Sequence, residues 1–367
     1  MRKRPRIRYH DRVRAGAMLL GQIGAACGRL ALVLCVAACG RLGFDAHTPD
    51  GAAPGVDAAA FDPASGGCQQ AESGPLVLAA TAPTHGGGYG VWAAPPYVLQ
   101  ADTTGGLHNL RFDGTAFTEV GALPGIGWTE AVWSDRTHYY VGAPGTGFYV
   151  IDVAADGSLA IRAQQTTTLS EARHGWLAGG MIVVPDGPNG LYAVQYDGVG
   201  TLTTVGTPLP TMGWAQGVWA RDRRVVFADA NVVRMLDFDG ATFTDLVTPN
   251  AAHGGASRVW SDGSIVYVTN GDGVTAYAMT ATTLTELDTF APGAAARDVW
   301  SDGAHVFTVA ENGMLYALAF DGAHFTMLDS TSTGTQGLGV FGDGTFVYSN
   351  DNSGGVHAYR GFSCLRW

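Results

Sequence analysis

The chain has 367 residues and carries 21 Lys and Arg against 32 Asp and Glu, for a formal net charge of -11. Residues 1–38 hold eight basic side chains and one acidic one, which leaves 13 basic and 31 acidic residues for the rest of the chain. Lys3 is the only lysine, so this acidic body offers little to phosphate groups and we expect no nucleic-acid partner. The 46% of hydrophobic residues is enough for a substantial core.

The first 38 residues have the organisation of an export signal. A basic segment precedes the apolar run Leu30–Val36, which is too short to span a bilayer but has the length of a signal-peptide hydrophobic region. The ending Val36-Ala37-Ala38-Cys39 resembles a bacterial lipobox. That resemblance implies cleavage before Cys39, a diacylglycerol on its thiol and, because Gly40 follows, the outer membrane. An ordinary export signal with an incidental cysteine is the alternative.

Residues 39–74 are predicted to form a lipidated flexible tether. They show no strand or helix period and are rich in Ala, Gly, Asp and Pro. Such a composition buries too little apolar surface to offset the loss of chain entropy on folding.

Beyond the tether, one unit recurs with a period of about 40 residues. Its marker is an aromatic residue that follows Val or Gly, and successive markers are separated by 41, 43, 43, 41, 40 and 41 residues. A fixed period of this length is typical of repeat architectures, whose units bury their apolar faces against one another. The seven markers are Trp92, Trp133, Trp176, Trp219, Trp260, Trp300 and Phe341.

Each unit has the pattern of four short strands. Ser261-Asp262-Gly263 predicts a tight turn after the marker strand, and the β-branched run Ile265–Val268 predicts the second strand. Leu315–Ala319 predicts a third strand, and Phe325-Thr326 begins a fourth. Four strands per unit and seven units predict an all-β, seven-bladed β-propeller over residues 75–367, with four antiparallel strands per blade. We expect the marker aromatics to pack between neighbouring blades.

The two ends of the repeat region are complementary. Only three strands follow the last marker, whereas one extra strand, Leu76–Ala80, precedes the first marker. We therefore expect this N-terminal strand to take the fourth place in the C-terminal blade, which closes the ring and removes its open edges.

Two short motifs carry a family resemblance. Tyr267-Val268-Thr269-Asn270 matches the YVTN motif, and Phe148-Tyr149-Val150-Ile151-Asp152 is similar to the LVIVD motif. The chain thus resembles the YVTN and LVIVD repeats of bacterial surface propellers, a WD40-like class. The resemblance implies the fold and adds little about function, because propellers host many unrelated activities.

The candidate binding residues lie just before the markers. In a propeller, the loops that enter the inner strands share one face around the central channel. Positions three before the markers carry mostly polar or aromatic residues, and a Trp stands five before the marker in two units. Such a mouth suits stacking and hydrogen bonding to a sugar or a peptide, and a mouth filled only by water is the alternative. The predicted ligand-binding residues are Tyr89, Trp128, Glu130, Arg173, Trp214, Gln216 and Arg297.

Metal and catalytic chemistry find less support. Asp and Asn residues of the second loops offer oxygen ligands for Ca²⁺, but they are also the commonest residues of tight turns, which explains them without a metal. His85 and His253 occupy equivalent loop positions, yet no zinc-binding spacing accompanies them. The sequence also contains no nucleophile elbow, Walker loop or dinucleotide fingerprint. We therefore predict no metal, no cofactor and no catalytic residue.

These observations favour a monomeric, lipid-anchored envelope protein whose propeller binds a small ligand, a glycan or a peptide at the channel mouth. A metal-dependent hydrolase or lactonase is the alternative and would need carboxylates and histidines around the channel. The positions at the mouth instead include one carboxylate, Glu130, and two arginines. A scaffold that docks proteins on its outer rim is a third interpretation.

Five cysteines are present: Cys27, Cys35, Cys39, Cys68 and Cys364. Cleavage at the lipobox removes the first two, and lipidation uses Cys39. The remaining pair, Cys68 and Cys364, flanks the two strands that ring closure would place side by side. Because disulfides persist in exported proteins, we expect these two cysteines to form one.

Overall fold

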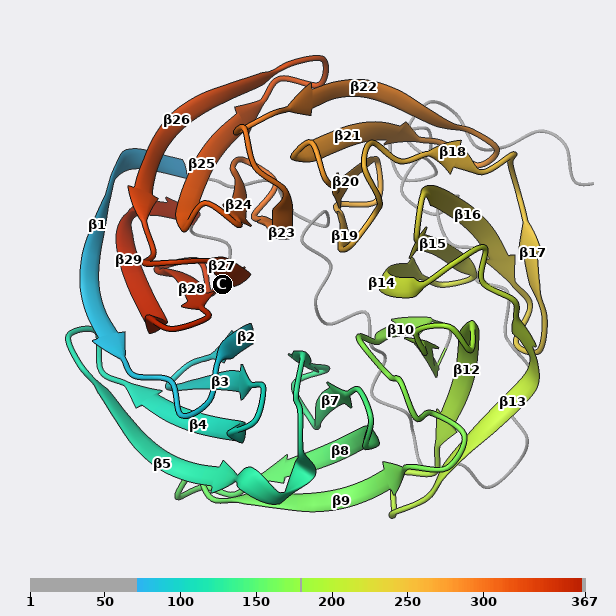
Figure 1. Ribbon diagram of the computed structural model, residues 1–367, viewed down its shortest axis with the longest axis horizontal. Coiled ribbons are helices and arrows are strands. Elements are labelled where there is room, and N and C mark those ends of the chain that lie inside the picture. The colour runs from blue at the N-terminus through green and yellow to red at the C-terminus, as the bar shows by residue number, and fades with distance from the viewer. Residues whose placement is uncertain (1–70, 179, 365–367) are drawn as a thin grey trace, which may run out of the picture. The chain divides into compact units, whose positions relative to one another are not determined.

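A computed structural model describes residues 71–178 and 180–364, which form seven antiparallel sheets around a common centre (Figure 1). The predicted all-β, seven-bladed propeller with four antiparallel strands per blade is confirmed. Within the described ranges, no helix has the length and hydropathy that a membrane crossing requires.

The first six blades each follow the chain from the inside outward. Blades one and two consist of β2 (Gly88–Ala94), β3 (Tyr97–Asp102), β4 (Gly106–Phe112), β5 (Phe117–Leu123), β6 (Ala131–Ser134), β7 (Tyr139–Ala143), β8 (Gly147–Val153) and β9 (Leu159–Gln165). Blades three and four consist of β10 (Trp176–Ala178), β11 (Met181–Pro185), β12 (Leu191–Tyr196), β13 (Leu202–Leu209), β14 (Ala215–Arg221), β15 (Arg224–Asp229), β16 (Val232–Phe238) and β17 (Phe243–Asp245). Blades five and six consist of β19 (Val259–Ser261), β20 (Ile265–Thr269), β21 (Val274–Met279), β22 (Leu284–Phe290), β23 (Ala296–Ser301), β24 (Val306–Ala310), β25 (Met314–Phe320) and β26 (Phe325–Ser332). Two short elements complete this part, the 3₁₀ turn η2 (Pro124–Ile126) and β18 (Asn250–Ala251), which pairs with β16.

The seventh blade closes the ring as predicted. It contains β27 (Gly337–Gly342), β28 (Val347–Asp351), β29 (Gly355–Cys364) and, as its outermost strand, β1 (Ala71–Ala82). The strand from the N-terminal side lies along the C-terminal strand in Figure 1, and the pairing register sets Leu78 opposite Tyr359. Both ends of the described chain are thereby held in one sheet, in which β1 is the outer edge strand.

Strand β1 begins at Ala71, four residues before the expected domain boundary at 75. Ala71–Ser73 find partners because β29 continues through Cys364, and an irregularity in the ladder follows at residues 74–76. Pro75 lies in that irregularity, where its missing N–H interrupts no regular ladder bond. The predicted signal peptide, the lipidated Cys39 and Cys68 lie outside the described residues, so the lipid anchor and the disulfide stay predictions.

The turn after the marker strand of the fifth blade uses the predicted chemistry. In blade five, Asp262 Oδ1 accepts hydrogen bonds from the N–H groups of Ser264 (2.7 Å) and Ile265 (2.8 Å). Gly263 adopts a positive φ of 100° within this turn, a conformation that most L-residues avoid. The short turn fixes the register between β19 and β20 and so places the marker Trp260 opposite Tyr267.

The marker aromatics pack differently from the expectation. They were expected between neighbouring blades, but several also meet across the propeller axis. Trp176 of the third blade contacts Trp92 of the first, with 6.5 Å between ring centroids, and Trp260 of the fifth, at 5.4 Å. Trp260 in turn lies 6.5 Å from Phe341 of the seventh blade. We call Trp92, Trp133, Trp176, Trp260, Trp300 and Phe341 the axial aromatic cluster. It fills the centre of the ring because rings of this size on four or more inner strands reach one another.

Candidate functional site

The channel above the axial aromatic cluster is narrow. Its free volume is ≈ 40 Å³, which is room for one or two water molecules and not for a sugar ring. A ligand of the size of a sugar must therefore bind over the mouth, where the inner strands begin. In four inner strands, β2, β14, β23 and β27, the pairing register shifts at the position three before the marker, and in β2 and β14 the position two before it is also unpaired. Such bulges change the direction of side chains, and they lie where Tyr89, Gln216 and Arg297 were predicted to line the mouth.

Glu130 and Arg173 form the strongest contact among the predicted residues. Arg173 Nη1 donates hydrogen bonds to Glu130 Oε1 (2.7 Å) and Oε2 (2.9 Å). The two residues come from neighbouring blades, and the backbone of Arg173 closely approaches Gly142, where a Cβ would lie 2.9 Å from the Arg173 carbonyl carbon. The Glu130 side chain is only 6% exposed, so this pair is largely removed from solvent and ties the second blade to the third.

Trp214 connects this ion pair to a groove. The guanidinium of Arg173 lies 5.0 Å from the centroid of the Trp214 ring, within the range of a cation–π contact. Trp214 also lines a groove of ≈ 340 Å³ over the fourth, fifth and sixth blades. We call this feature the mouth groove. Its lining residues are Trp214, Gln216, Ala230, Asn231, Gly254, Gly255, Ala256, Ser257, Asn270, Gly271, Ala295, Ala296 and Arg297.

The mouth groove is lined by glycine backbone and by polar side chains. Gly254 and Gly271 meet backbone to backbone, since a Cβ on Gly271 would lie 2.7 Å from the Gly254 carbonyl oxygen. Ser257 Oγ donates a hydrogen bond to Gln216 Oε1 (3.2 Å). This bond fixes the orientation of the Gln216 side-chain amide. Arg297 is paired with Glu311, while its buried Nε has no hydrogen-bond partner among the described residues.

Tyr89 lies at the opposite side of the mouth and depends on a residue that sequence reasoning missed. The guanidinium of Arg258 lies 5.9 Å from the centroid of the Tyr89 ring. Burial raises the pKa of the Tyr89 hydroxyl, the charge of Glu130 raises it further, and Arg258, Arg297 and Arg173 oppose the rise. Tyr89 therefore stays neutral at ordinary pH and is electrostatically close to four charged groups of the mouth.

Three titratable residues line the channel below the mouth, each two positions before its marker: His174, Arg258 and Asp298. Desolvation raises the pKa of Asp298 to about 6, although Arg258 lowers it and the N–H groups of Val340 (2.9 Å) and Val299 (3.0 Å) donate to its carboxylate. Desolvation lowers the pKa of His174 to about 3, and Arg258 acts in the same direction. In the sequence, the only indication of these three residues is that each directly follows a position three before a marker.

The predicted residues thus divide into groups. Glu130, Arg173 and Trp214 are in mutual contact, while Trp214, Gln216 and Arg297 line one groove. Trp128 occupies the same repeat position as Trp214 and is 47% exposed, but it is not among the residues that line the mouth groove. The repeat therefore supplies a matched pair of tryptophans, one beside the groove and one away from it.

The second-loop carboxylates are engaged in the protein itself. Asp102, Asp229 and Asp351 accept hydrogen bonds from the loops that lead into their own blades, for example from Gly87 N to Asp102 Oδ1 (2.6 Å) and from Gln336 N to Asp351 Oδ2 (2.8 Å). Each carboxylate holds its own loop, so these acids do not converge on a common Ca²⁺ position in the described structure. Their role is structural, as turn and loop chemistry predicts.

Comparisons with known proteins show the fold and nothing narrower. No protein-family model matches the sequence, and no curated protein matches it. Among solved structures, the β-propeller domain of Cps50 (Swd1) from Myceliophteria thermophila is similar with a TM-score of 0.63 and 9% identity, covering 79% of this chain and 99% of that one. The computationally designed Ika8 protein is similar with a TM-score of 0.58 and 11% identity, covering 77% and 99%. A protein from Bacteroides uniformis, provisionally named a 6-phosphogluconolactonase, has a TM-score of 0.56 and 12% identity, covering 72% and 88%. At these identities the likeness establishes a β-propeller fold.

Proposed function

We propose that the propeller is a binding module and that the mouth groove holds a short glycan. The observation that carries the proposal is the composition of the groove. It combines one partly exposed indole, the side-chain amides of Gln216 and Asn231, the hydroxyl of Ser257 and the guanidinium of Arg297. Its volume of ≈ 340 Å³ falls within the range of about 300–1,000 Å³ typical of small-ligand sites.

The arrangement matches the chemistry of a sugar. A sugar ring has a face of C–H groups that stacks on an indole and an edge of hydroxyl groups that hydrogen-bond to amides and guanidinium groups. The cation–π contact with Arg173 helps to hold the Trp214 ring in place before a ligand arrives.

Catalysis is less well supported by the same groove. None of its described lining residues is Asp, Glu, His or Cys, so it offers no general acid, general base or nucleophile. Two carboxylates near these residues are already paired with arginines, Glu311 with Arg297 and Glu130 with Arg173. Lactonase activity, which the provisional name of the Bacteroides structure suggests, would need chemistry that this groove does not supply.

We further propose that the protein acts at the bacterial cell envelope, anchored by a lipid on Cys39. The support is the sequence Val36-Ala37-Ala38-Cys39 after a short apolar run. Replacing Cys39 by Ser should abolish incorporation of a labelled fatty acid and release the propeller in soluble form. Membrane fractionation of this variant that equals that of the natural protein would argue against the anchor.

The groove itself is tested by a glycan array followed by calorimetry with the best glycan. Trp214→Ala should weaken binding by about 10-fold or more, since buried aromatic contacts dominate such sites. Trp128→Ala is the matched control because Trp128 has the same repeat position and lies outside the groove. Equal losses in both variants, or binding of peptides but no glycan, would contradict the assignment.

A further inference from the structure

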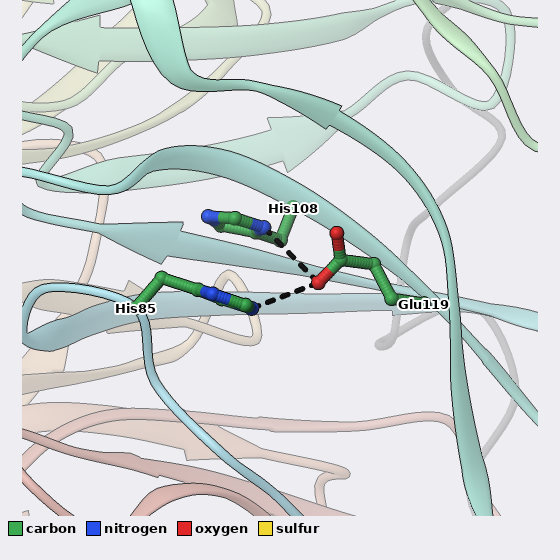
Figure 2. A group of neighbouring side chains, drawn as sticks. All are labelled: His85, His108 and Glu119. Atoms are coloured by element: carbon green, nitrogen blue, oxygen red, sulfur yellow. Dashed lines mark hydrogen bonds and ion pairs between the residues drawn. The ribbon is translucent and has the colours of Figure 1, made fainter.

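A second group of side chains, away from the mouth groove, converges on one carboxylate oxygen. His85 lies in the loop between β1 and β2, His108 on β4 and Glu119 on β5 (Figure 2). His85 Nε2 lies 2.8 Å from Glu119 Oε2, and His108 Nδ1 lies 3.3 Å from the same oxygen. One ligand-type atom from each residue falls within 4.8 Å of the other two. The chain spacing between these residues gave no metal motif, and strand pairing brings them together.

The hydrogen bonds of His108 leave a lone pair directed at the carboxylate. Its Nε2 lies 3.2 Å from the Gly105 carbonyl oxygen, which can only accept, so Nε2 carries the proton. In the neutral ring Nδ1 is then unprotonated, and this atom is buried with no hydrogen-bond partner in the described structure. A lone pair and a carboxylate oxygen facing each other at 3.3 Å repel unless a cation lies between them.

The surroundings resemble those of a metal-binding histidine. A backbone carbonyl that accepts from the outer ring nitrogen is the usual way in which the tautomer of a ligating histidine is set. The rings of His85 and His108 are stacked, with centroids 4.1 Å apart and an angle of 11° between planes (Figure 2). The ring lone pairs lie in these two nearly parallel planes, so the His85 ring must turn before both rings can bind one ion.

The loop that carries His85 is fixed, but its side chain is accessible. Asp102 accepts hydrogen bonds from Thr84 Oγ1 and Gly87 N, both at 2.6 Å, and from the N–H of His85. The His85 side chain is 45% exposed, whereas the whole of His108 is 4% exposed. A cation can therefore reach the cluster from solvent, and a rotation of His85 can close the ligand set around it.

The fifth blade provides an internal comparison. His253 occupies the loop position of His85 and lies 3.1 Å from both oxygens of Glu286, which occupies the place of Glu119 opposite the third strand. The place of His108 in the third strand is taken by Thr275, whose hydroxyl is bonded to Thr289 and Asn270. The fifth blade thus has the histidine–glutamate pair without the buried second imidazole.

We propose that His85 Nε2, His108 Nδ1 and Glu119 bind a divalent transition-metal ion of the zinc class. Two imidazoles and one carboxylate form a three-ligand set that leaves a fourth position for water. Ligand atoms on a tetrahedral zinc ion are about 3.3 Å apart at bond lengths of about 2.0–2.1 Å. Glu119 Oε2 lies 2.8 and 3.3 Å from the two histidine nitrogens, and one ligand atom of each residue lies within 4.8 Å of the other two. The ion would join the loop that leaves β1, the closing strand of the seventh blade, to the first blade. It would therefore clamp the seam at which the ring closes.

The test is a zinc titration of the chelator-treated full chain, measured by calorimetry in competition with a weak chelator. We expect one tight equivalent and a rise in melting temperature on zinc addition, because an ion bound only by the native state stabilises it. His108→Thr reproduces the fifth blade and should lower the affinity at least about 100-fold, since loss of even an outer partner typically costs about 10–100-fold. The exposed His85→Asn and Glu119→Gln variants should do the same.

His253→Ala is the control, and it should bind zinc as the natural chain does. The proposal is overturned if the natural chain binds no zinc, or if His85→Asn and Glu119→Gln retain its affinity. The last two variants change exposed side chains, so they decide the question even where His108→Thr does not fold. Loss of zinc binding in His253→Ala with retention in His85→Asn would place the ion elsewhere and would also refute the assignment.

Discussion

Arg173 holds both carboxylate oxygens of Glu130 from a neighbouring blade, at 2.7 and 2.9 Å, and lies over the ring of Trp214. One guanidinium thus joins a contact between blades to the wall of the mouth groove. Because the carboxylate is nearly removed from solvent, its partner cannot be lost without leaving a charge unpaired. Stability and ligand positioning are coupled at this residue.

Replacing Arg173 alone should lower the free energy of unfolding more than replacing both Arg173 and Glu130. We expect Arg173→Ala to lower the free energy of unfolding by about 1–3 kcal/mol, because an unsatisfied charged group is left behind. The added change Glu130→Gln should recover part of the loss. Urea denaturation of the two single variants and the double variant measures the coupling, and strictly additive losses would show that the pair contributes nothing.

Truncating a tryptophan of the axial aromatic cluster should lower stability, whereas truncating Trp214 in the mouth groove should mainly weaken ligand binding. Trp260→Ala should lower the free energy of unfolding by about 3–5 kcal/mol, because Trp260 is buried and contacts rings from three other blades. Trp214→Ala should change stability by less than about 1 kcal/mol while weakening ligand binding, since Trp214 is 39% exposed. Denaturation curves separate the two effects, and a Trp214 loss equal to that of Trp260 would contradict the assignment of Trp214 to a binding role.

The channel carboxylate predicts a pH dependence of stability. The pKa of Asp298 is raised to about 6 in the folded chain from the ordinary value of 3.8, so the folded state keeps a proton that the unfolded state releases. The resulting stabilisation is complete below 3.8 and is lost as the pH rises through about 6. A pKa difference of this size corresponds to a free energy on the order of 3 kcal/mol. Asp298→Asn should remove this dependence, and melting curves between pH 4 and 7 that are parallel for both proteins would refute it.

His174 should act in the opposite direction over a similar range. Its pKa is lowered to about 3 in the folded chain from 6.5, so the unfolded state binds a proton that the folded state does not. Its contribution is complete above 6.5 and is lost as the pH falls toward 3. His174→Ala, which copies Ala131 of the second blade, should flatten the fall in melting temperature on acidification. An unchanged acid limb would show that His174 is protonated in the folded protein.

The blade count and the ring closure could be read from the sequence because both rest on local signals. Turn residues and β-branched runs mark each strand, and one extra strand at the N-terminal end with one missing strand at the C-terminal end predicts the closure. The meeting of Trp176 with Trp92 and Trp260 across the axis was not predictable in this way. The distance that an inner-strand side chain reaches toward the axis depends on the twist of its sheet. The spacing of residues in the sequence gives no information about that twist.

The candidate site was predicted in part for a similar reason. The rule of three residues before each marker found Arg173, Glu130, Gln216 and Arg297. It missed Arg258 and Asp298, which lie one position further along and line the channel. Asp298 follows a bulge at Arg297 in β23, which changes the direction of neighbouring side chains. His108 and Glu119 were missed because only the pairing of β4 with β5 brings them together.

The last prediction concerns the two cysteines that remain after processing. Cys364 is the final residue of β29, and its backbone pairs with Ala71, three residues after Cys68. Cys68 itself lies outside the described residues. We predict a disulfide that joins the two ends of the ring and closes a loop of about 300 residues, worth up to about 4–5 kcal/mol by loop-closure entropy. Peptide mapping without reductant should recover one cross-linked peptide, and Cys364→Ser should lower the unfolding midpoint to that of the reduced natural chain. Recovery of both residues as free thiols would refute the bridge while leaving the strand pairing that closes the ring intact.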